Sequence, residues 1–487
     1  MLLYLGALPM DFVARKQELA LLDSLYKRSG AQFLVLYGRR RVGKTRLITH
    51  WLSRLQGPHL YWMATQTTAT NQLRKFSQAL FGFLHPGVHL DPTFSYATWE
   101  AAFAEVARAS QTQRLVLVLD EFTYAMQADP EVPSLIQKAW DHALSASNLF
   151  LILTGSQAGI IQRAVLDYQS PLYGRATARL KLQPLPFGAL SEMLPSFSTE
   201  QRVAVYAITG GIPAYASLFD DHLTLLANLQ ERIVTPANVM LSDAAFLLQE
   251  QLDEPRNYMA LIEAIAAGYH KLSDIALMAG IDRSNVGKYL AVLRELGYVE
   301  RHVPATVRDP NQSRQGRYVI ADSYLRFYYR FLAPNIDAIE SGRTRQALSL
   351  LHDHLLDFIG THTWEELCRE WVGIKAEMGE LPFLPERIGS FWSQTTQVDV
   401  VALNWRTHNA LLGECKWSPR PVDVDVLQKL VVKTPKVLPA GIDWRRGFAF
   451  FTRQQFTPEA ERYAGELGAQ LVALPQLETD FRRWMDR

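Results

Sequence analysis

The chain is poor in cysteine, in long apolar runs and in net charge. Only Cys368 and Cys415 occur among its 487 residues, which excludes a disulfide scaffold and a zinc-ribbon cluster and suits a reducing compartment. No stretch approaches the roughly 20 apolar residues of a membrane-spanning helix, and the apolar first ten residues lack the basic segment of a secretory signal. The formal net charge is +1, so a surface for nucleic acid has to be local. We therefore expect a cytoplasmic protein without a membrane partner.

The remaining composition is that of ordinary folded domains. Hydrophobic residues make up 48% of the chain and charged residues 20%, a balance that is typical of globular proteins and not of disorder. A chain of 487 residues exceeds the size of a single hydrophobic core, so we expect two to four domains.

One glycine-rich loop organises the first third of the chain. It fits the phosphate-loop pattern G-x-x-x-x-G-K-[ST], with an apolar run at 33–37 before it and helical spacing at 46–52 after it. A strand, a glycine loop and a helix N-terminus together direct backbone N–H groups at a phosphate chain. Lys44 is predicted to contact the β- and γ-phosphates of ATP and Thr45 to bind Mg²⁺. The predicted nucleotide-binding residues of the loop are Gly38, Arg39, Arg40, Arg41, Val42, Gly43, Lys44 and Thr45.

Two later apolar strands carry the polar residues that complete such a site. Residues 115–119 run into Asp120 and Glu121; Asp120 is predicted to orient Mg²⁺ through water and Glu121 to polarise the attacking water. The strand at 149–153 ends in small polar residues, of which Thr154 or Ser156 could sense the γ-phosphate. Ordinary turn chemistry after a strand is the alternative for that pair.

Arg175 follows a glycine in a turn. An arginine there could stabilise transition-state charge as a finger, in its own chain or on a neighbouring subunit of a homo-oligomer. The alternative is a surface salt bridge.

Residues 255–320 read as three short helices followed by two strands, the pattern of a winged helix. Before them lies a helical stretch from about Ser198, broken by the turn at 209–213. A winged helix can bind DNA through its third helix and its wing, or serve as a protein-contact module. The candidate DNA-binding residues are Arg283, Ser284, Asn285, Lys288, Arg314 and Arg317.

The last part of the chain carries an acidic hairpin. Asp399 lies in a predicted strand at 398–403 and Glu414 in the return strand at 410–417. Lys416 is two residues beyond Glu414, so both side chains leave the same face of the strand. With Glu365 from a preceding helix, the two acids are predicted to hold Mg²⁺ or Mn²⁺, and Lys416 to activate water for phosphodiester cleavage. Cross-strand surface ion pairs are the alternative.

These segments together resemble a family of prokaryotic AAA-type ATPases, often called archaeal ATPases, that carry a C-terminal domain of unknown function. The resemblance rests on GRRRVGKT, LVLDEF, LTGSQ, LYGR, GGIPAY and ADSYLRFYYRF. The last domain resembles the restriction-endonuclease-like PD-(D/E)xK fold, although Val398 stands where that pattern has proline. The implied fold is α/β multidomain: a P-loop AAA-type parallel sheet at 11–195, a helical lid at 196–254, a winged helix at 255–343 and a nuclease-like α/β domain at 344–487.

Two functions fit this organisation. In the first, an ATPase with Mg²⁺ is coupled to DNA binding and to metal-dependent DNA cleavage by the C-terminal domain. In the second, a regulatory ATPase binds DNA or protein, and its nuclease-like domain is catalytically silent. The trio Asp399, Glu414 and Lys416 favours the first, and the near-neutral charge favours the second.

Overall fold

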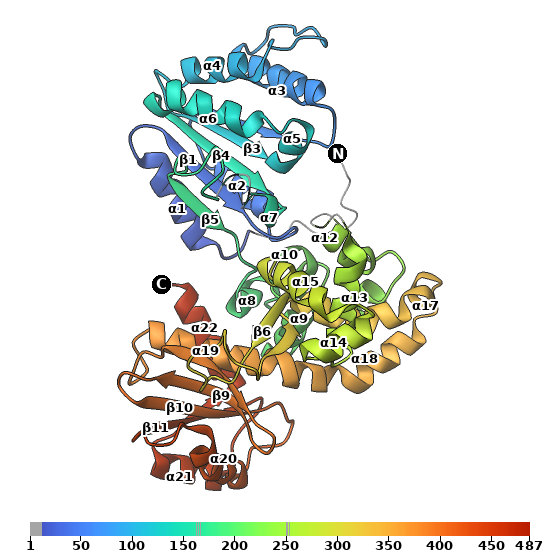
Figure 1. Cartoon of the computed structure of the whole chain (residues 1–487), viewed down its shortest axis with the longest axis vertical. Helices are drawn as coiled ribbons and strands as arrows, with labels where there is room; N and C mark the ends of the chain where they lie inside the picture. The colour runs from blue at the N-terminus through green and yellow to red at the C-terminus, as the bar shows by residue number, and fades with distance from the viewer. Residues whose placement is uncertain (1–11, 162, 164, 166, 250–251, 253) are drawn as a thin grey trace. The chain divides into compact units, whose positions relative to one another are not determined.

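The computed structural model describes residues 12–161, 163, 165, 167–249, 252 and 254–487 (Figure 1). The chain divides into two compact units, Arg15–Pro184 and Leu185–Arg487, and residues 12–14 belong with the second. The first unit therefore ends before residue 195, the expected boundary of the ATPase core. Residue 11, where that core was expected to begin, lies outside the described residues.

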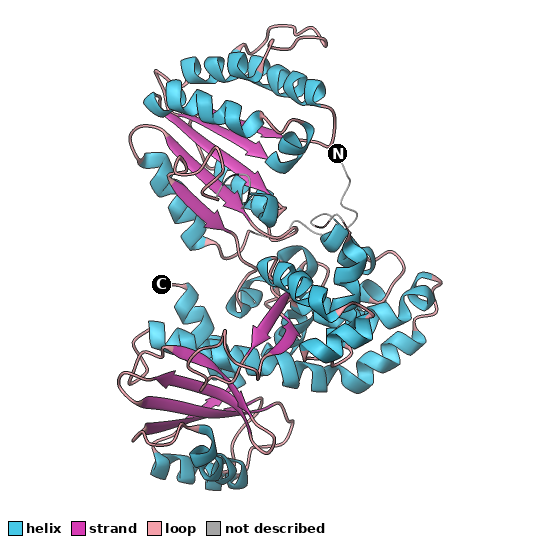
Figure 2. Cartoon of the chain, in the orientation of Figure 1, coloured by secondary structure: helices cyan, strands magenta, loops and turns pink. Residues whose placement is uncertain are grey.

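The first unit is built on a parallel five-stranded sheet (Figure 2). Its three central strands are almost wholly apolar, as expected of strands buried on both faces. The expected strands at 33–37, 60–64, 115–119 and 149–153 are all present, whereas the short edge strand β5 was not predicted. The sheet order is β2-β3-β4-β1-β5, with β1 at Gln32–Tyr37, β2 at His59–Met63, β3 at Leu115–Asp120, β4 at Leu149–Gly155 and β5 at Ala178–Lys181.

Helices cover both faces of this sheet, so its strands are buried on two sides. On one face Trp51 packs edge-on against Phe150 of β4, at 5.8 Å between ring centroids, and against Tyr26. On the other face a cluster of aromatic rings, among them Trp62 and Phe76 at 5.3 Å, fills the core. The helices are α1 (Lys16–Lys27), α2 (Lys44–Ser53), α3 (Ala69–Leu84), α4 (Trp99–Ala109), α5 (Phe122–Ala128), α6 (Val132–His142) and α7 (Ala158–Ile161).

The second unit opens with the helical stretch expected as a lid. Ser198 and Gln201 form a capping box that starts α9, and Gly210 ends it with φ 61°. A Cβ on Gly211 would lie 2.1 Å from the carbonyl oxygen of Leu185, so this turn requires glycine. The helices are α8 (Leu190–Met193), α9 (Thr199–Thr209), α10 (Pro213–Ala216), α11 (Leu225–Asn228) and α12 (Val239–Gln249).

The winged-helix elements lie where the sequence predicts them. They are α13 (Pro255–Ala266), α14 (Leu272–Ala279), α15 (Arg283–Glu295), β6 (Val299–His302) and β7 (Arg317–Ile320), the strands pairing antiparallel. Asp282 caps α15 by accepting from the N–H of Ser284, and Val286, Leu290 and Leu293 face the core. Apolar residues at this spacing form one buried stripe, which fixes the helix against its neighbours.

An aromatic segment follows and packs inside the unit. It comprises α16 (Ser323–Phe327) and a π-helical turn over Tyr328–Leu332. Tyr324, Phe327 and Phe331 are fully buried, which confirms that these rings serve packing. The helices α17 (Ile336–Glu340) and α18 (Arg345–Phe358) then lead into the last domain.

The last domain is a mixed five-stranded sheet in the order β12-β11-β10-β9-β8. β8, β9 and β10 pair antiparallel and the remaining pairs are parallel, so the expected antiparallel hairpin is present. From α19 to β11 the domain runs as a helix, three strands, a helix and a strand, which makes it the α/β domain that was expected. Its elements are α19 (Glu365–Glu377), β8 (Arg387–Trp392), β9 (Gln397–Asn404), β10 (Asn409–Lys416), α20 (Val424–Val437), β11 (Arg445–Thr452), α21 (Pro458–Leu467), β12 (Gln470–Ala473) and α22 (Leu474–Met485).

Candidate nucleotide site and candidate acidic site

The glycine loop has the backbone that its sequence predicts. It joins the carboxyl end of β1 to α2, and Gly43 has φ 100°. A Cβ on Gly38 would lie 2.5 Å from the carbonyl oxygen of Leu182. Both glycines are therefore required by the backbone itself, as expected of a phosphate loop.

Lys44 is the first residue of α2 and is 5% exposed. Its Nζ donates to the carbonyl oxygens of Gly38 at 3.0 Å and Arg39 at 3.2 Å. The ammonium is thus folded onto the loop, and phosphate oxygens of a nucleotide can take the place of these carbonyls.

Arg15 braces the loop from outside, a role that the sequence pattern did not indicate. Its guanidinium donates to the carbonyl oxygens of Val42 at 3.1 Å and Gln183 at 2.7 Å, and it pairs with Glu18 at 2.8 Å. The residue ties the phosphate loop to the segment that follows β5. An arginine just before a helix has no local signal for such a distant partner.

Asp120 is fully buried at the end of β3 and is surrounded by donors. Its carboxylate accepts from Thr45 Oγ1 at 2.8 Å, Thr154 Oγ1 at 2.9 Å, the Glu121 N–H at 2.9 Å and the Tyr61 hydroxyl. The structure therefore brings Thr45 and Asp120 together as predicted. Tyr61 was not foreseen; burial and the nearby Asp120 raise the pKa of its phenol, which keeps it a donor.

Glu121 follows with a left-handed backbone, φ 49°. Its Oε2 accepts from the N–H of Ser156 at 3.3 Å and from Ser156 Oγ at 2.9 Å. Burial raises the pKa of this carboxyl, the charge of Lys44 lowers it and that of Asp120 raises it. Ser156, predicted to contact the nucleotide, thus holds the predicted general base in place.

Arg175 lies at the opposite end of the sheet from the phosphate loop. Two residues later, Thr177 hydrogen-bonds Phe33 at the start of β1, at 2.8 and 2.9 Å, while the loop follows Tyr37 at the end of that strand, about 13 Å away at 3.3 Å per residue. The Arg175 guanidinium makes a bidentate ion pair with Asp141, at 2.8 and 2.6 Å. This position argues against a finger that acts on the nucleotide of its own chain.

The third helix of the winged helix presents its predicted residues to the surface. Arg283, Ser284, Asn285 and Lys288 are all exposed on α15. The Ser284 hydroxyl is engaged by Asp282 at the helix cap. The remaining three side chains form a small polar face that suits phosphate contacts.

The wing packs against strand β8 of the last domain. The Ala305 N–H donates to the Ser390 carbonyl at 2.8 Å, and the Arg387 guanidinium donates to the carbonyls of Val307 and Arg308. Of the two predicted wing residues, Arg314 is exposed on the wing loop.

Arg317, by contrast, lies over the ring of Trp392, 4.8 Å from its centroid. Arg317 is nevertheless exposed at the start of β7, so its contact with DNA stays a prediction, and β8, which the sequence pattern did not reveal, lies beside it.

The acidic hairpin forms as its spacing predicts. Gly413 pairs with Val400, and the same antiparallel register places Glu414 across from Asp399. Lys416 Nζ lies 2.7 Å from Glu414 Oε1, which confirms that both side chains leave the same face of β10. Asp399 Oδ2 accepts a hydrogen bond of 3.0 Å from the backbone N–H of Cys415, the residue after Glu414.

Glu365 reaches this site from the start of α19. Arg369 lies 3.3 Å from Glu365 and donates to the carbonyl of Asp399 at 2.9 Å. Burial, and then the charge of Asp399, raise the pKa of Glu365 to about 7. Burial and Glu414 likewise raise the pKa of Asp399. These acids lie close enough to disfavour one another's ionisation, an arrangement that a cation would stabilise.

The acids are near one another but do not form a closed metal shell. Within the described residues, the three-ligand set whose atoms lie within 4.8 Å of one another is the partly exposed group Asp220, Asp221 and His222, and not the predicted trio. The chemistry of the trio nevertheless fits a hard divalent cation, because it offers carboxylate oxygens. Glu414 Oε2 is buried without a hydrogen bond in the described part of the chain, with Lys433 Nζ at 3.6 Å.

Three family models match successive parts of the chain. An ATPase domain predominantly from Archaea matches residues 12–219, an IclR helix-turn-helix domain matches 257–302, and archaea bacterial proteins of unknown function match 328–426. The phosphate loop, the three helices of the winged helix with β6, and the acidic hairpin thus fall in three separate matches.

The chain is also similar to individual proteins. The uncharacterized protein MJECL04 of Methanocaldococcus jannaschii is 32% identical over 409 residues, 83% of this chain and 87% of that protein. The uncharacterized ATP-binding protein MJ0423 of the same organism is 51% identical over 41 residues, 8% of this chain and 70% of that protein. The solved Walker-type ATPase PABY2304 of Pyrococcus abyssi matches with a TM-score of 0.50 and 20% identity, over 66% of this chain and 96% of that chain.

The fold and the nucleotide site define an ATPase of the archaeal P-loop type, joined to a winged-helix module and a C-terminal α/β domain. The chain belongs to the family of archaeal-type ATPases that includes MJECL04. No helix in the described part of the chain is long and apolar enough to cross a membrane.

Proposed function

We propose that this protein is a Mg²⁺-dependent ATPase that binds DNA through its winged helix and cleaves phosphodiester bonds at the acidic site of its last domain. The observation that carries the nuclease half is the pairing of Asp399 and Glu414 across one hairpin, with Lys416 beside Glu414 at 2.7 Å. A purely structural hairpin does not require three ionisable groups at this depth.

At the nucleotide site different residues bind the phosphates, hold the metal and accept the proton. Lys44 binds the β- and γ-phosphates, while Thr45 and Asp120 would hold Mg²⁺, which neutralises phosphate charge when bound. Glu121, oriented by Ser156, accepts a proton from the attacking water. Its raised pKa makes it a stronger base than a solvent-exposed carboxylate.

At the acidic site Asp399, Glu414 and Glu365 would hold Mg²⁺ or Mn²⁺, which polarises a phosphate and acidifies a water when bound. When the acids hold a metal, the Lys416 ammonium must give up its ion pair with Glu414. It can then offset phosphate charge or orient the water. Arg369 stays on the Asp399 carbonyl and keeps Glu365 turned towards the site.

DNA binding is supported by the exposed face of α15. Arg283, Asn285 and Lys288 are available for backbone contacts while the wing is packed on β8. This leaves the third helix as the surface that meets the duplex.

The test is a nicking assay on supercoiled plasmid with Mg²⁺ or Mn²⁺, with and without ATP. Cleavage should require Asp399, and Asp399→Ala should leave ATP hydrolysis intact. Lys416→Ala should lose cleavage but retain the rise in melting temperature on metal addition. Intact plasmid, single-stranded and branched DNA under every condition, with no metal-dependent melting shift, would refute the nuclease.

A second function is favoured by one specific observation. Lys416 and Lys433 both lie beside Glu414, at 2.7 and 3.6 Å, and together they neutralise the acidic hairpin without a metal. In that case the protein is a regulatory ATPase with a silent nuclease-like domain. Lys416→Ala should then neither create nor abolish any cleavage, and DNA binding should remain.

A further inference from the structure

A cavity of about 510 Å³ lies between the winged helix and the last domain. Its walls come from the end of α13, the two wing strands, the π-helical turn after α16, helices α18 and α19, and strand β8. The volume is within the range of ligand-binding pockets. The cavity is separate from the nucleotide site, since all of its walls belong to the second compact unit.

Arginines outnumber carboxylates in the wall. Four arginines line the cavity against three carboxylates, together with four histidines. Arg326 is neutralised by a bidentate pair with Glu366 at 2.5 and 2.6 Å, and Arg369 lies 3.3 Å from Glu365.

The other two arginines lack a carboxylate within the described chain. Arg330 is exposed at the cavity wall, and no carboxylate lies within 4.0 Å of it or of Arg317 among the described residues. Two arginines without an acidic partner in one concave wall suit a ligand that brings several negative charges of its own.

Aromatic rings stand beside these charges. Trp392 and Phe391 of β8 line the cavity, and Trp392 is half-buried with Arg317 over its face at 4.8 Å. Arginines combined with an aromatic platform are the elements that bind unpaired nucleic acid, because every base has a face that stacks and every linkage carries a charge.

The cavity also adjoins the acidic site. Glu365 and Arg369 belong to its wall, and Arg369 donates to the carbonyl of Asp399 at 2.9 Å. A strand lying in the cavity would therefore reach the acids of the hairpin.

We propose that this cavity binds an unpaired segment of nucleic acid, with Arg317 and Arg330 on its phosphates and Trp392 stacked on a base. Presentation of that segment to Asp399 and Glu414 rests on the proposed nuclease function, whereas the binding itself does not.

The test measures binding by the full chain to a short, labelled, 5′-phosphorylated single-stranded DNA in EDTA, which prevents metal-dependent cleavage. Arg330→Ala should weaken binding and lower the salt slope by about 0.7, the value for one phosphate contact on a single strand. Trp392→Ala should weaken binding about fivefold or more through loss of stacking. Arg343→Ala, an exposed arginine outside the cavity wall, is the matched control and should bind like the parent.

Duplex DNA of the same length distinguishes the cavity from the winged helix, and its affinity should be unchanged in the Arg330 and Trp392 variants. Equal ATPase activity and melting temperature verify that Arg330→Ala folds. Parental single-strand affinity in both variants would overturn the proposal, as would competition by a nucleoside monophosphate at concentrations equal to those of the strand. Asp399→Ala should retain single-strand binding. If the parent protein binds the single strand but cleaves no DNA with Mg²⁺ or Mn²⁺, the nuclease proposal is refuted and the cavity assignment stands.

Discussion

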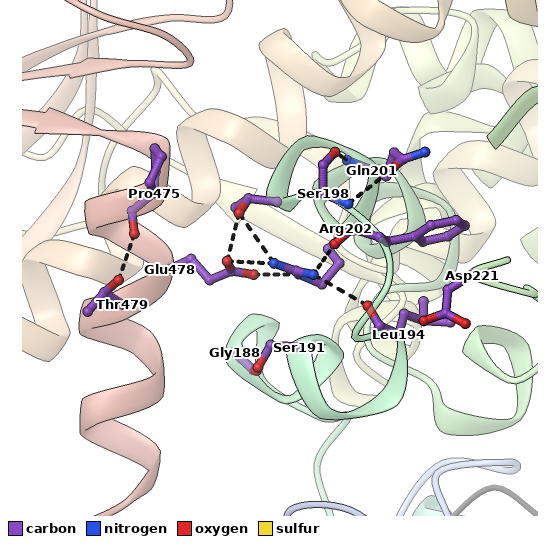
Figure 3. Close-up of polar contacts among 12 residues, drawn as sticks. Gly188, Ser191, Leu194, Ser198, Gln201, Arg202, Asp221, Pro475, Glu478 and Thr479 are labelled. Atoms are coloured by element: carbon purple, nitrogen blue, oxygen red, sulfur yellow. Dashed lines mark hydrogen bonds and ion pairs between the residues drawn. The ribbon is translucent and has the colours of Figure 1, made fainter. Parts of the chain in front are cut away.

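Arg202 on α9 and Glu478 on α22 form a buried ion pair although 276 residues separate them (Figure 3). Two parallel bonds join them, at 2.6 and 2.8 Å, and Thr199 donates a third bond to Glu478 at 2.7 Å. The remaining Arg202 nitrogen donates to the carbonyls of Leu194 and Phe197. Because each charge is satisfied, the pair secures the last helix to the lid.

Removing one member should therefore unfold this junction. Glu478→Ala leaves the Arg202 charge buried, and we expect a loss of about 3–5 kcal/mol of unfolding free energy. The paired change Arg202→Met with Glu478→Leu should cost less than either single change, because no charge is left alone. Chemical denaturation followed by tryptophan fluorescence measures both. Lys429→Ala, which removes an exposed pair with Asp425, should leave the midpoint nearly unchanged.

Glu121 should be needed for turnover and not for nucleotide binding. Glu121→Gln keeps the size of the side chain but cannot accept a proton, so ATP hydrolysis should fall on the order of 10²–10⁴-fold. Lys44→Ala should instead abolish tight binding. Phosphate release and titration with a fluorescent nucleotide separate the two effects, and Arg108→Ala on the exposed side of α4 should behave as wild type. Normal hydrolysis by the Lys44 variant would show that the site is misassigned.

Arg175 should act between subunits. Its place at the amino end of β1 keeps it from its own phosphate loop, so a finger requires a neighbouring chain. We expect Arg175→Ala to reduce turnover about 10³-fold and equimolar Lys44→Ala protein to restore part of it. If the mixture restores no hydrolysis, or if Arg175→Ala alone hydrolyses ATP at the normal rate, Arg175 is not a finger. Its role would then be the structural ion pair with Asp141.

The exposed face of α15 should set the salt dependence of duplex binding. Each of Arg283→Ala and Lys288→Ala should reduce the slope of log affinity against log salt by about 0.9, the value for one phosphate contact. Arg345→Ala, an exposed arginine on α18, should not change it. An affinity independent of salt would instead make this winged helix a protein-contact module.

His362 should make the second unit acid-sensitive. Burial, and then the charge of Arg326, lower the pKa of His362 to about 4, while Glu366 opposes them and His270 and Arg330 lower it further. A histidine whose folded pKa lies below its unfolded pKa contributes stability that is present above about pH 6.5 and is lost as the pH falls towards 4.

The parent should lose up to about 3 kcal/mol of unfolding free energy between pH 6.5 and 4 through this group. We therefore expect the melting temperature of His362→Phe to fall less than that of the parent over the same pH range. The phenyl ring can keep the edge contact with Phe358, whose centroid lies 5.4 Å away. His352→Phe, at a site where the imidazole is 77% exposed, is the control and should retain the parental pH dependence. An unchanged pH profile in His362→Phe would show that His362 is not the titrating group.

The sequence by itself determined the elements whose signals are local. The phosphate loop with its flanking strand and helix, the three helices of the winged helix, and the hairpin that pairs Asp399 with Glu414 all follow from spacing within a few tens of residues. The aromatic segment near Phe327 was rightly interpreted as packing, because dense rings on a helix are most stable when buried.

The tertiary structure alone decided which distant groups meet. Tyr61 and Thr154 contact Asp120, Ser156 holds Glu121, and Arg175 lies at the far end of β1, because the order of strands in a sheet depends on packing and not on any single segment. Strand β8, which carries no strong alternation of its own, packs against the wing and thereby places Trp392 beneath the Arg317 guanidinium. The same long-range packing encloses the arginine-lined cavity, since its walls come from segments that only the folded chain brings together.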